Sequence, residues 1–216
     1  MSRVAQRRKD EKAEARREAR EARRASRRAA GRPVDAIELR PRLLIVCEGE
    51  RTEPQYFSGF RLNGDVVGEG DHTLGLVRTA IARRDEDGRY TETWVVFDRD
   101  SFEAERFNAA LDLAQREGLR VAVTNQAFEL WYLLHFEYCD ADLHRSTYQE
   151  RLTRYLERPY RKNDLSMYAE LRPRQGEACG NAARLVLLHG ERWNPERQGP
   201  GTTVHLLVER LNALER

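Results

Sequence analysis

Carboxylate residues follow two apolar segments of the sequence, and their spacing could create a metal site. Glu48 comes directly after the apolar run 42–47, and Asp98 and Asp100 follow the apolar run 93–97. Alternate residues of an extended chain face the same way, so Asp98 and Asp100 can present two carboxylates to one point. Taken alone, this pair could equally be an acidic turn that caps a helix. Together with Glu48 at the end of another strand, it favours a metal site.

The acidic set favours a hard divalent cation. Carboxylates packed together repel each other unless they are protonated or share a cation. Mg²⁺, or Mn²⁺ in its place, takes oxygen ligands and often binds through one or two carboxylates plus a substrate phosphate. Zn²⁺ fits poorly because no Cys/His cluster has ligand spacing. Glu53 could reach the same region, although the dipole of the helix expected there would also favour an acid.

The elements that must position these acids indicate an α/β fold. Strands are expected at 42–47, 93–97 and 119–123, with a short strand also open at 66–67. Strands that alternate with helices are typical of a mostly parallel sheet flanked by helices, and ligands gather at the carboxyl ends of its strands. Thr52 is expected to cap the first helix. Helices are expected near 52–61, 74–81, 102–114, 127–136, 147–157, 177–189 and 203–214, so the C-terminal part is largely helical.

The charge is distributed unevenly along the chain. Residues 1–32 contain 13 Lys and Arg against 5 Asp and Glu, whereas the remainder contains 25 against 31. We therefore predict a basic arm and linker at 1–40 and one domain at 41–216. The arm is either a solvated, frayed helix or a contact to nucleic-acid phosphates without sequence preference.

The sequence composition also indicates the cellular compartment of the protein. No apolar run approaches the roughly 20 residues needed to cross a bilayer, and no apolar segment follows the basic N-terminus as in a signal peptide. Cys47, Cys139 and Cys179 share no metal-ligand or redox spacing and lie within or beside apolar runs. These features predict a cytoplasmic protein with reduced thiols and no membrane contact.

Four motifs give the sequence a resemblance to a known family. They are CEGERTEP at 47–54, VVFDRD at 95–100, FELWYLLHF at 128–136 and TTVH at 202–205. Together they resemble the RloB-like family, found near restriction and abortive-infection genes. The first two look like the glutamate and DxD elements of Toprim domains. The resemblance implies a Toprim-like, Rossmann-like fold and a metal-dependent nucleic-acid hydrolase in phage defence, often alongside an ATPase partner.

The resemblance adds Glu129 and His135 as candidates for the active centre. Six residues apart on an ideal helix, their side chains would point about 120° apart. They can cooperate only if the helix begins after Glu129, or if each contacts a different part of the substrate. His135 shares a face with Phe128 and Trp131, so a histidine at the edge of the core is an equal alternative.

Two further residues carry weaker signals. Lys162 is the only lysine outside the basic arm, and an ammonium group there could contact phosphate or stabilise a transition state. That this one lysine is retained by chance is an equal alternative. His205 lies at the expected start of the last helix, where either a surface position or a phosphate contact is conceivable.

Three hypotheses follow, and the first, which is favoured, is given last. The second is a Toprim-like phosphotransferase or primase module, for which 216 residues leave little room. The third is a non-catalytic nucleic-acid or partner-binding subunit of an ATPase-containing defence complex, which would not need the full acidic set. DNA or RNA targets, tRNA included, and a homodimer stay open. The first and favoured hypothesis is a Mg²⁺-dependent nuclease with metal ligands Glu48, Asp98 and Asp100, assisted by Glu53, Glu129, His135 or Lys162.

Overall fold

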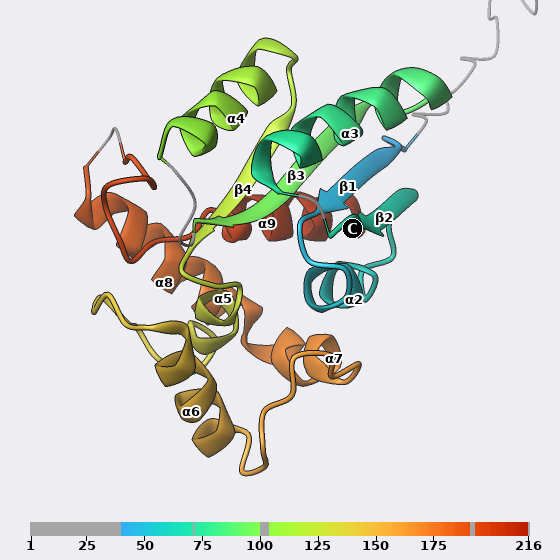
Figure 1. The fold of residues 1–216 in the computed structure, drawn as a ribbon. Coiled ribbons are helices and arrows are strands. Elements are labelled where there is room, and N and C mark those ends of the chain that lie inside the picture. Colours follow the sequence, from blue (N-terminus) through green and yellow to red (C-terminus); the bar gives the residue numbers. More distant parts are fainter. Residues whose placement is uncertain (1–39, 71, 100–103, 191–192, 216) are drawn as a thin grey trace, which may run out of the picture. The chain divides into compact units, whose positions relative to one another are not determined.

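A parallel β-sheet forms the centre of the fold (Figure 1). The computed structural model describes residues 40–70, 72–99, 104–190 and 193–215. Within these residues the sheet has four strands in the order β2-β1-β3-β4, and every neighbouring pair is parallel. The expected α/β class is confirmed. The strands are β1 (Leu43–Cys47), β2 (Gly64–Gly68), β3 (Glu92–Arg99) and β4 (Arg120–Asn125).

The central strand β1 explains why its sequence is continuously apolar. All five residues are buried, because β1 lies between β2 and β3 and both faces of the sheet are covered. Alternate residues enter different cores. Leu44 and Val46 join one buried cluster, and Leu43, Ile45 and Cys47 join the other.

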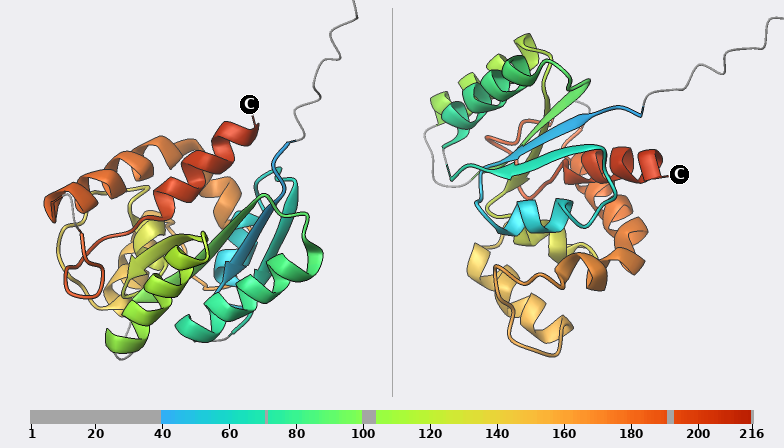
Figure 2. Two further views of the ribbon diagram at one scale, coloured as in Figure 1. Left: turned by 90° about the horizontal axis from the view of Figure 1, so that it is seen from above. Right: turned by 90° about the vertical axis from the view of Figure 1, so that its right-hand side faces the viewer.

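Helices cover the two faces of the sheet unequally (Figure 2). One face carries α3 (Thr73–Asp87) and α4 (Ala104–Arg116). The other face carries the larger, aromatic-rich core, where Tyr56, Trp131 and Tyr132 are almost fully buried. The elements on that side are α2 (Thr52–Phe57), α5 (Glu129–Leu133), α6 (Arg145–Tyr155), α7 (Met167–Leu171), the 3-10 turn η1 (Arg172–Arg174), α8 (Gln175–Leu188) and α9 (Val204–Glu215).

Two predicted helices are shorter than expected. Helix α2 ends at Phe57 instead of near residue 61, because the backbone then tightens into turns in which the Gly59 N–H donates to Tyr56 O and the Phe60 N–H to Phe57 O. Helix α5 covers only Glu129–Leu133, since the backbone then tightens into bonds such as His135 N to Tyr132 O. Helix α7 and the turn η1 were not predicted.

The predicted cap of α2 is wrong. Arg51 occupies the N-cap position without a side-chain bond, and Thr52 is the first residue of the helix. The Thr52 hydroxyl instead donates to the backbone oxygen of Lys162 at 2.8 Å. A tertiary contact has therefore replaced the expected local one.

Several expectations fall on residues that the structure does not describe. Asp100 and the start of the following helix lie in 100–103, and the basic arm lies before residue 40. These expectations, and the proposed domain boundaries, stay predictions. All three cysteines are free thiols, and Cys47 and Cys139 are buried. Among the described helices, none has the length and apolar character required to cross a lipid bilayer.

Candidate metal centre at the carboxyl edge of the sheet

Glu48 and Asp98 lie side by side at the carboxyl edge of the sheet. Glu48 follows β1, and its backbone N–H donates to Val96 on β3. Its side-chain Oε2 accepts a hydrogen bond of 3.0 Å from the backbone N–H of Asp98, 50 residues further along the chain. The parallel pairing of β1 with β3 creates this juxtaposition. Strand β3 continues through Asp98, so a regular ladder, and not a loop, holds this residue.

The Asp98 carboxyl group lies in a site that disfavours its negative charge. Burial raises its pKa well above the usual value, and Glu53, Glu48 and Glu129 raise it further by repulsion. One opposing contact is the backbone N–H of Phe128, which donates to Asp98 Oδ2 at 3.0 Å. A cation at this point would relieve the repulsion.

Glu53, in the first turn of α2, belongs to an acidic cluster that also contains Glu48, Asp98 and Glu129. Its side chain is only 7% exposed and packs against Gly49, where an added Cβ would lie 2.0 Å from Glu53 Oε2. Burial raises the pKa of Glu53, with a further contribution from Glu129, whereas Lys162 lowers it. The absence of a side chain at Gly49 is what allows Glu53 to occupy this position.

Glu129 is buried among apolar residues and has the partners that such a position requires. It is 3% exposed and begins helix α5. Its Oε1 accepts hydrogen bonds from Gln149 Nε2 at 3.0 Å and from the Tyr160 hydroxyl at 3.3 Å. These two donors fix the orientation of the carboxylate. No contact with Glu129 was predicted from the sequence for either Gln149 or Tyr160.

His135 is part of the aromatic core and is not brought to the carboxylates. Its ring is fully buried, its Nδ1 is 2.9 Å from Trp131 O, and its centroid is 4.8 Å from that of Trp131. Burial lowers its pKa to about 4, so the ring is neutral at physiological pH. These contacts favour the structural alternative for His135 over a role beside Glu129.

His205 is buried as well. Its Nδ1 is 3.1 Å from the backbone oxygen of Thr202, and burial lowers its pKa. Neither the surface position nor the phosphate contact considered for His205 agrees with this placement.

Lys162 lies on an exposed segment next to α2. Its backbone oxygen accepts the Thr52 hydroxyl, and its charge opposes that of Glu53. Thr52 and Glu53 are neighbours, so the contact holds the Lys162 segment beside the acidic cluster. This placement agrees with a side chain that acts near the acids.

The acidic cluster has the donor groups to hold a magnesium ion through a small number of protein ligands. Within the described part of the chain, no group of three or more His, Cys, Asp or Glu side chains is arranged to hold a metal ion, and Asp100 lies outside it. Glu48 and Asp98 supply two carboxylates. Mg²⁺ commonly uses one or two, together with water and substrate oxygens. The donor chemistry therefore suits Mg²⁺ or Mn²⁺.

An acidic cluster at the carboxyl edge of an all-parallel sheet defines an α/β protein with a carboxylate-lined site. The model of the family described as RloB-like protein matches residues 43–211, and the chain belongs to the RloB-like family. No curated protein and no solved structure matches the chain significantly. The likeness to Toprim domains rests on the two acidic motifs alone and stays a prediction.

Proposed function

We propose that this protein is a metal-dependent nuclease that hydrolyses phosphodiester bonds in DNA or RNA, tRNA included. The observation that carries the proposal is the hydrogen bond from the Asp98 backbone N–H to the Glu48 carboxylate, which brings acidic residues that follow or end two neighbouring strands together. The raised pKa of Asp98 supports it, because the carboxyl groups are arranged in a way that a divalent cation would stabilise.

The chain's own residues supply distinct parts of this chemistry. Glu48 and Asp98 would hold Mg²⁺ or Mn²⁺, with Asp100 as the expected third ligand. A bound ion would polarise a phosphoryl oxygen and lower the pKa of a water molecule. Glu53, whose pKa is raised, can exchange a proton with the attacking water or the leaving oxygen. Glu129, fixed by two donors, acts as a positioning residue for this cluster.

The test compares three forms of the full-length protein freed of metal with a chelator. Wild type should cut nucleic acid when Mg²⁺ or Mn²⁺ is added, and Asp98→Asn should lose this activity while remaining folded. Asp112→Asn, an exposed acid on α4, is the matched control and should cut like wild type. If Asp98→Asn cuts as well as wild type, the assignment of Asp98 as a metal ligand is wrong. If wild type loaded with metal does not cut nucleic acid, the nuclease proposal is wrong.

A second function has one observation in its favour. The described residues contain no complete three-ligand site, which suits a non-catalytic subunit that binds nucleic acid or an ATPase partner. This alternative predicts that wild type binds nucleic acid but leaves it intact with every divalent ion. Recovery of the chain with an ATPase encoded nearby would support the partner role under either function.

Membership of the RloB-like family suggests where the activity operates. We infer a role as the effector of an anti-phage abortive-infection system. Cells that express wild type should resist phage infection, and cells that express Asp98→Asn should not. Sequencing of DNA and RNA ends from both cultures would identify the target.

A further inference from the structure

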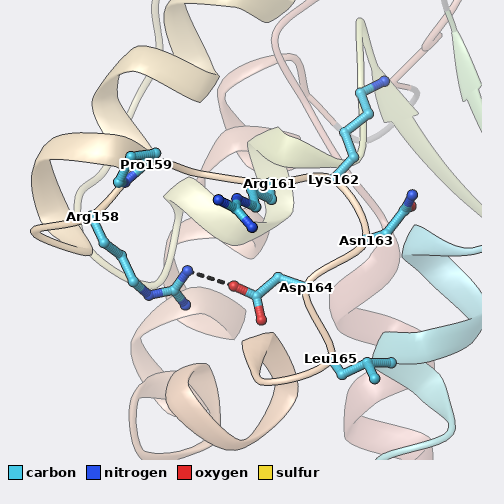
Figure 3. Close-up of a pocket in the computed structure, with 7 residues that line it drawn as sticks. All are labelled: Arg158, Pro159, Arg161, Lys162, Asn163, Asp164 and Leu165. Carbon is cyan, nitrogen blue, oxygen red and sulfur yellow. Dashed lines mark hydrogen bonds and ion pairs between the residues drawn. The ribbon is translucent and has the colours of Figure 1, made fainter.

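The segment 158–165 lines a pocket of about 680 Å³ (Figure 3). It connects α6 to α7, and it carries three basic side chains against a single acidic one. Its basic character is unusual in a body where acids outnumber bases. The residues that line the cavity are Arg158, Pro159, Arg161, Lys162, Asn163, Asp164 and Leu165.

The acidic residue of this segment is neutralised by its neighbours. Arg158 pairs with Asp164 at 2.5 Å and also with Glu170 at 2.6 Å. Ser166 donates to Asp164 Oδ1 through its backbone N–H at 2.9 Å and its hydroxyl at 2.6 Å. These contacts lower the pKa of Asp164 and hold the turn in shape. Arg158 and Asp164 therefore have structural roles.

The other two cations are available to a ligand. Arg161 and Lys162 are exposed and form no salt bridge within the residues that the structure describes. In Figure 3, Lys162 and Asn163 point away from the pair formed by Arg158 and Asp164, whereas Arg161 extends in a different direction from Lys162. Two cations and an amide on a fixed turn are the side-chain types that contact phosphate groups.

Two contacts tie this segment to the acidic cluster. The Thr52 hydroxyl bonds to Lys162 O, and the Tyr160 hydroxyl bonds to Glu129. Glu53 follows Thr52 directly, so each contact reaches an acid of the cluster or its immediate neighbour. A phosphate group bound by this segment would therefore lie on a part of the chain that contacts the acids or their neighbours.

We propose that residues 158–165 bind the sugar-phosphate backbone of a nucleic acid and so place an adjacent phosphodiester at Glu48 and Asp98. This inference rests on the proposed nuclease function and adds the surface that holds its substrate. Phosphate contacts fix the register of a bound strand but carry no base preference. Sequence preference, if the protein has any, must come from other residues.

The experiment measures binding without cleavage. Fluorescent single-stranded and duplex oligonucleotides of DNA and RNA are titrated with full-length protein in chelator, at several salt concentrations. Arg161→Gln combined with Lys162→Gln should weaken binding to all sequences alike. The slope of log K against log salt concentration should fall by about 2, roughly 1 for each phosphate contact removed.

Control variants test whether the change in binding is specific to the segment 158–165. Arg78→Gln combined with Arg116→Gln removes two exposed arginines from α3 and α4, on the other face of the sheet, and should leave the slope unchanged. Both double variants keep the basic N-terminal arm, so its contribution is common to both. Lys162→Arg, which retains the charge, should bind like wild type.

The outcomes separate this inference from the nuclease proposal. Equal affinity and slope for wild type and the Arg161/Lys162 double variant would overturn the inference, even if wild type cuts nucleic acid. Absence of any binding by wild type would overturn it too. Selective loss of binding in that double variant, together with a wild type that cuts nothing with Mg²⁺ or Mn²⁺, would support the binding surface and refute the nuclease.

Discussion

The carboxylate of Glu48 accepts a hydrogen bond from the backbone N–H of Asp98, across the adjacent parallel strands β1 and β3. The bond fixes Glu48 against the backbone of the residue whose own carboxyl group it repels. Strand pairing thus holds two like charges together, and the cost of this arrangement should be measurable as a dependence on pH and on divalent ions.

The first prediction concerns the pH dependence of stability without metal. The pKa of Asp98 is raised in the folded state above its usual 3.8, so its contribution to stability is complete below that value and is lost as pH rises through the folded pKa. Chemical denaturation of wild type and Asp98→Asn, compared at each pH from 4 upward, should isolate this loss from the opposite contribution of His135, which both proteins share. The loss should be smaller in Asp98→Asn, which has no charge to bury.

Divalent ions should reverse that loss. Mg²⁺ or Mn²⁺ at 100 times its Kd should stabilise wild type by about 2.7 kcal/mol, because only the folded state holds the acids together. Asp98→Asn should gain much less, as measured by the shift in melting temperature. An identical shift in both proteins would show that the ion binds elsewhere.

The second prediction concerns Gly49→Ala. The new methyl group would lie 2.0 Å from Glu53 Oε2, so the buried Glu53 side chain must move. We expect a loss of about 1–3 kcal/mol in the free energy of unfolding, together with weaker metal-dependent stabilisation. Gly180→Ala on α8 is the matched control, since nothing lies within 4 Å of an added Cβ there. It should stabilise the protein by roughly 0.5–1 kcal/mol.

The third prediction concerns Thr52→Val. The substitution removes the hydroxyl that bonds to Lys162 O and should cost about 0.5–1.5 kcal/mol. Backbone amides of 158–165 should then exchange hydrogen faster. Thr91→Val removes a similar bond, from Thr91 to Arg42 O, and should leave exchange in 158–165 unchanged. Unaltered exchange in Thr52→Val would mean that other contacts hold the segment.

The fourth prediction concerns His135. Its pKa falls from 6.5 in the unfolded chain to about 4 in the folded protein. Its contribution to stability is therefore complete above pH 6.5 and is lost as pH falls toward 4, by about 3 kcal/mol at most. His135→Gln should flatten this acid-side decline in a denaturation series. Because the ring stays neutral, the pH profile of any activity should keep its shape in this variant.

The strands and the neighbouring acids were predictable from the sequence for one physical reason. A strand buried on both faces, such as β1, must be apolar throughout, and parallel strands deliver the residues that follow them to one edge. The likeness of this edge to a Toprim site was read from the same motifs.

The supports of the site were not predictable. Gln149 and Tyr160 reach Glu129 from segments 20 and 31 residues away, and neither lies in a pattern that marks such a contact. Thr52 had every local feature of a helix cap, yet its hydroxyl bonds to a residue 110 positions later. Side-chain pairing across segments depends on tertiary packing, which hydrophobic periodicity does not encode.

The division of the interior by the sheet offers a practical advantage to anyone who studies this protein. Helices α3 and α4 pack on a core of their own, on the opposite face of the sheet from α2 and α5, which carry Glu53 and Glu129. A fluorophore or an affinity tag can therefore be attached to the exposed side of α3, for instance at Arg78, on the face of the sheet opposite to Glu53 and Glu129. Substrate titrations could be followed there without any alteration of the chemistry on the opposite side.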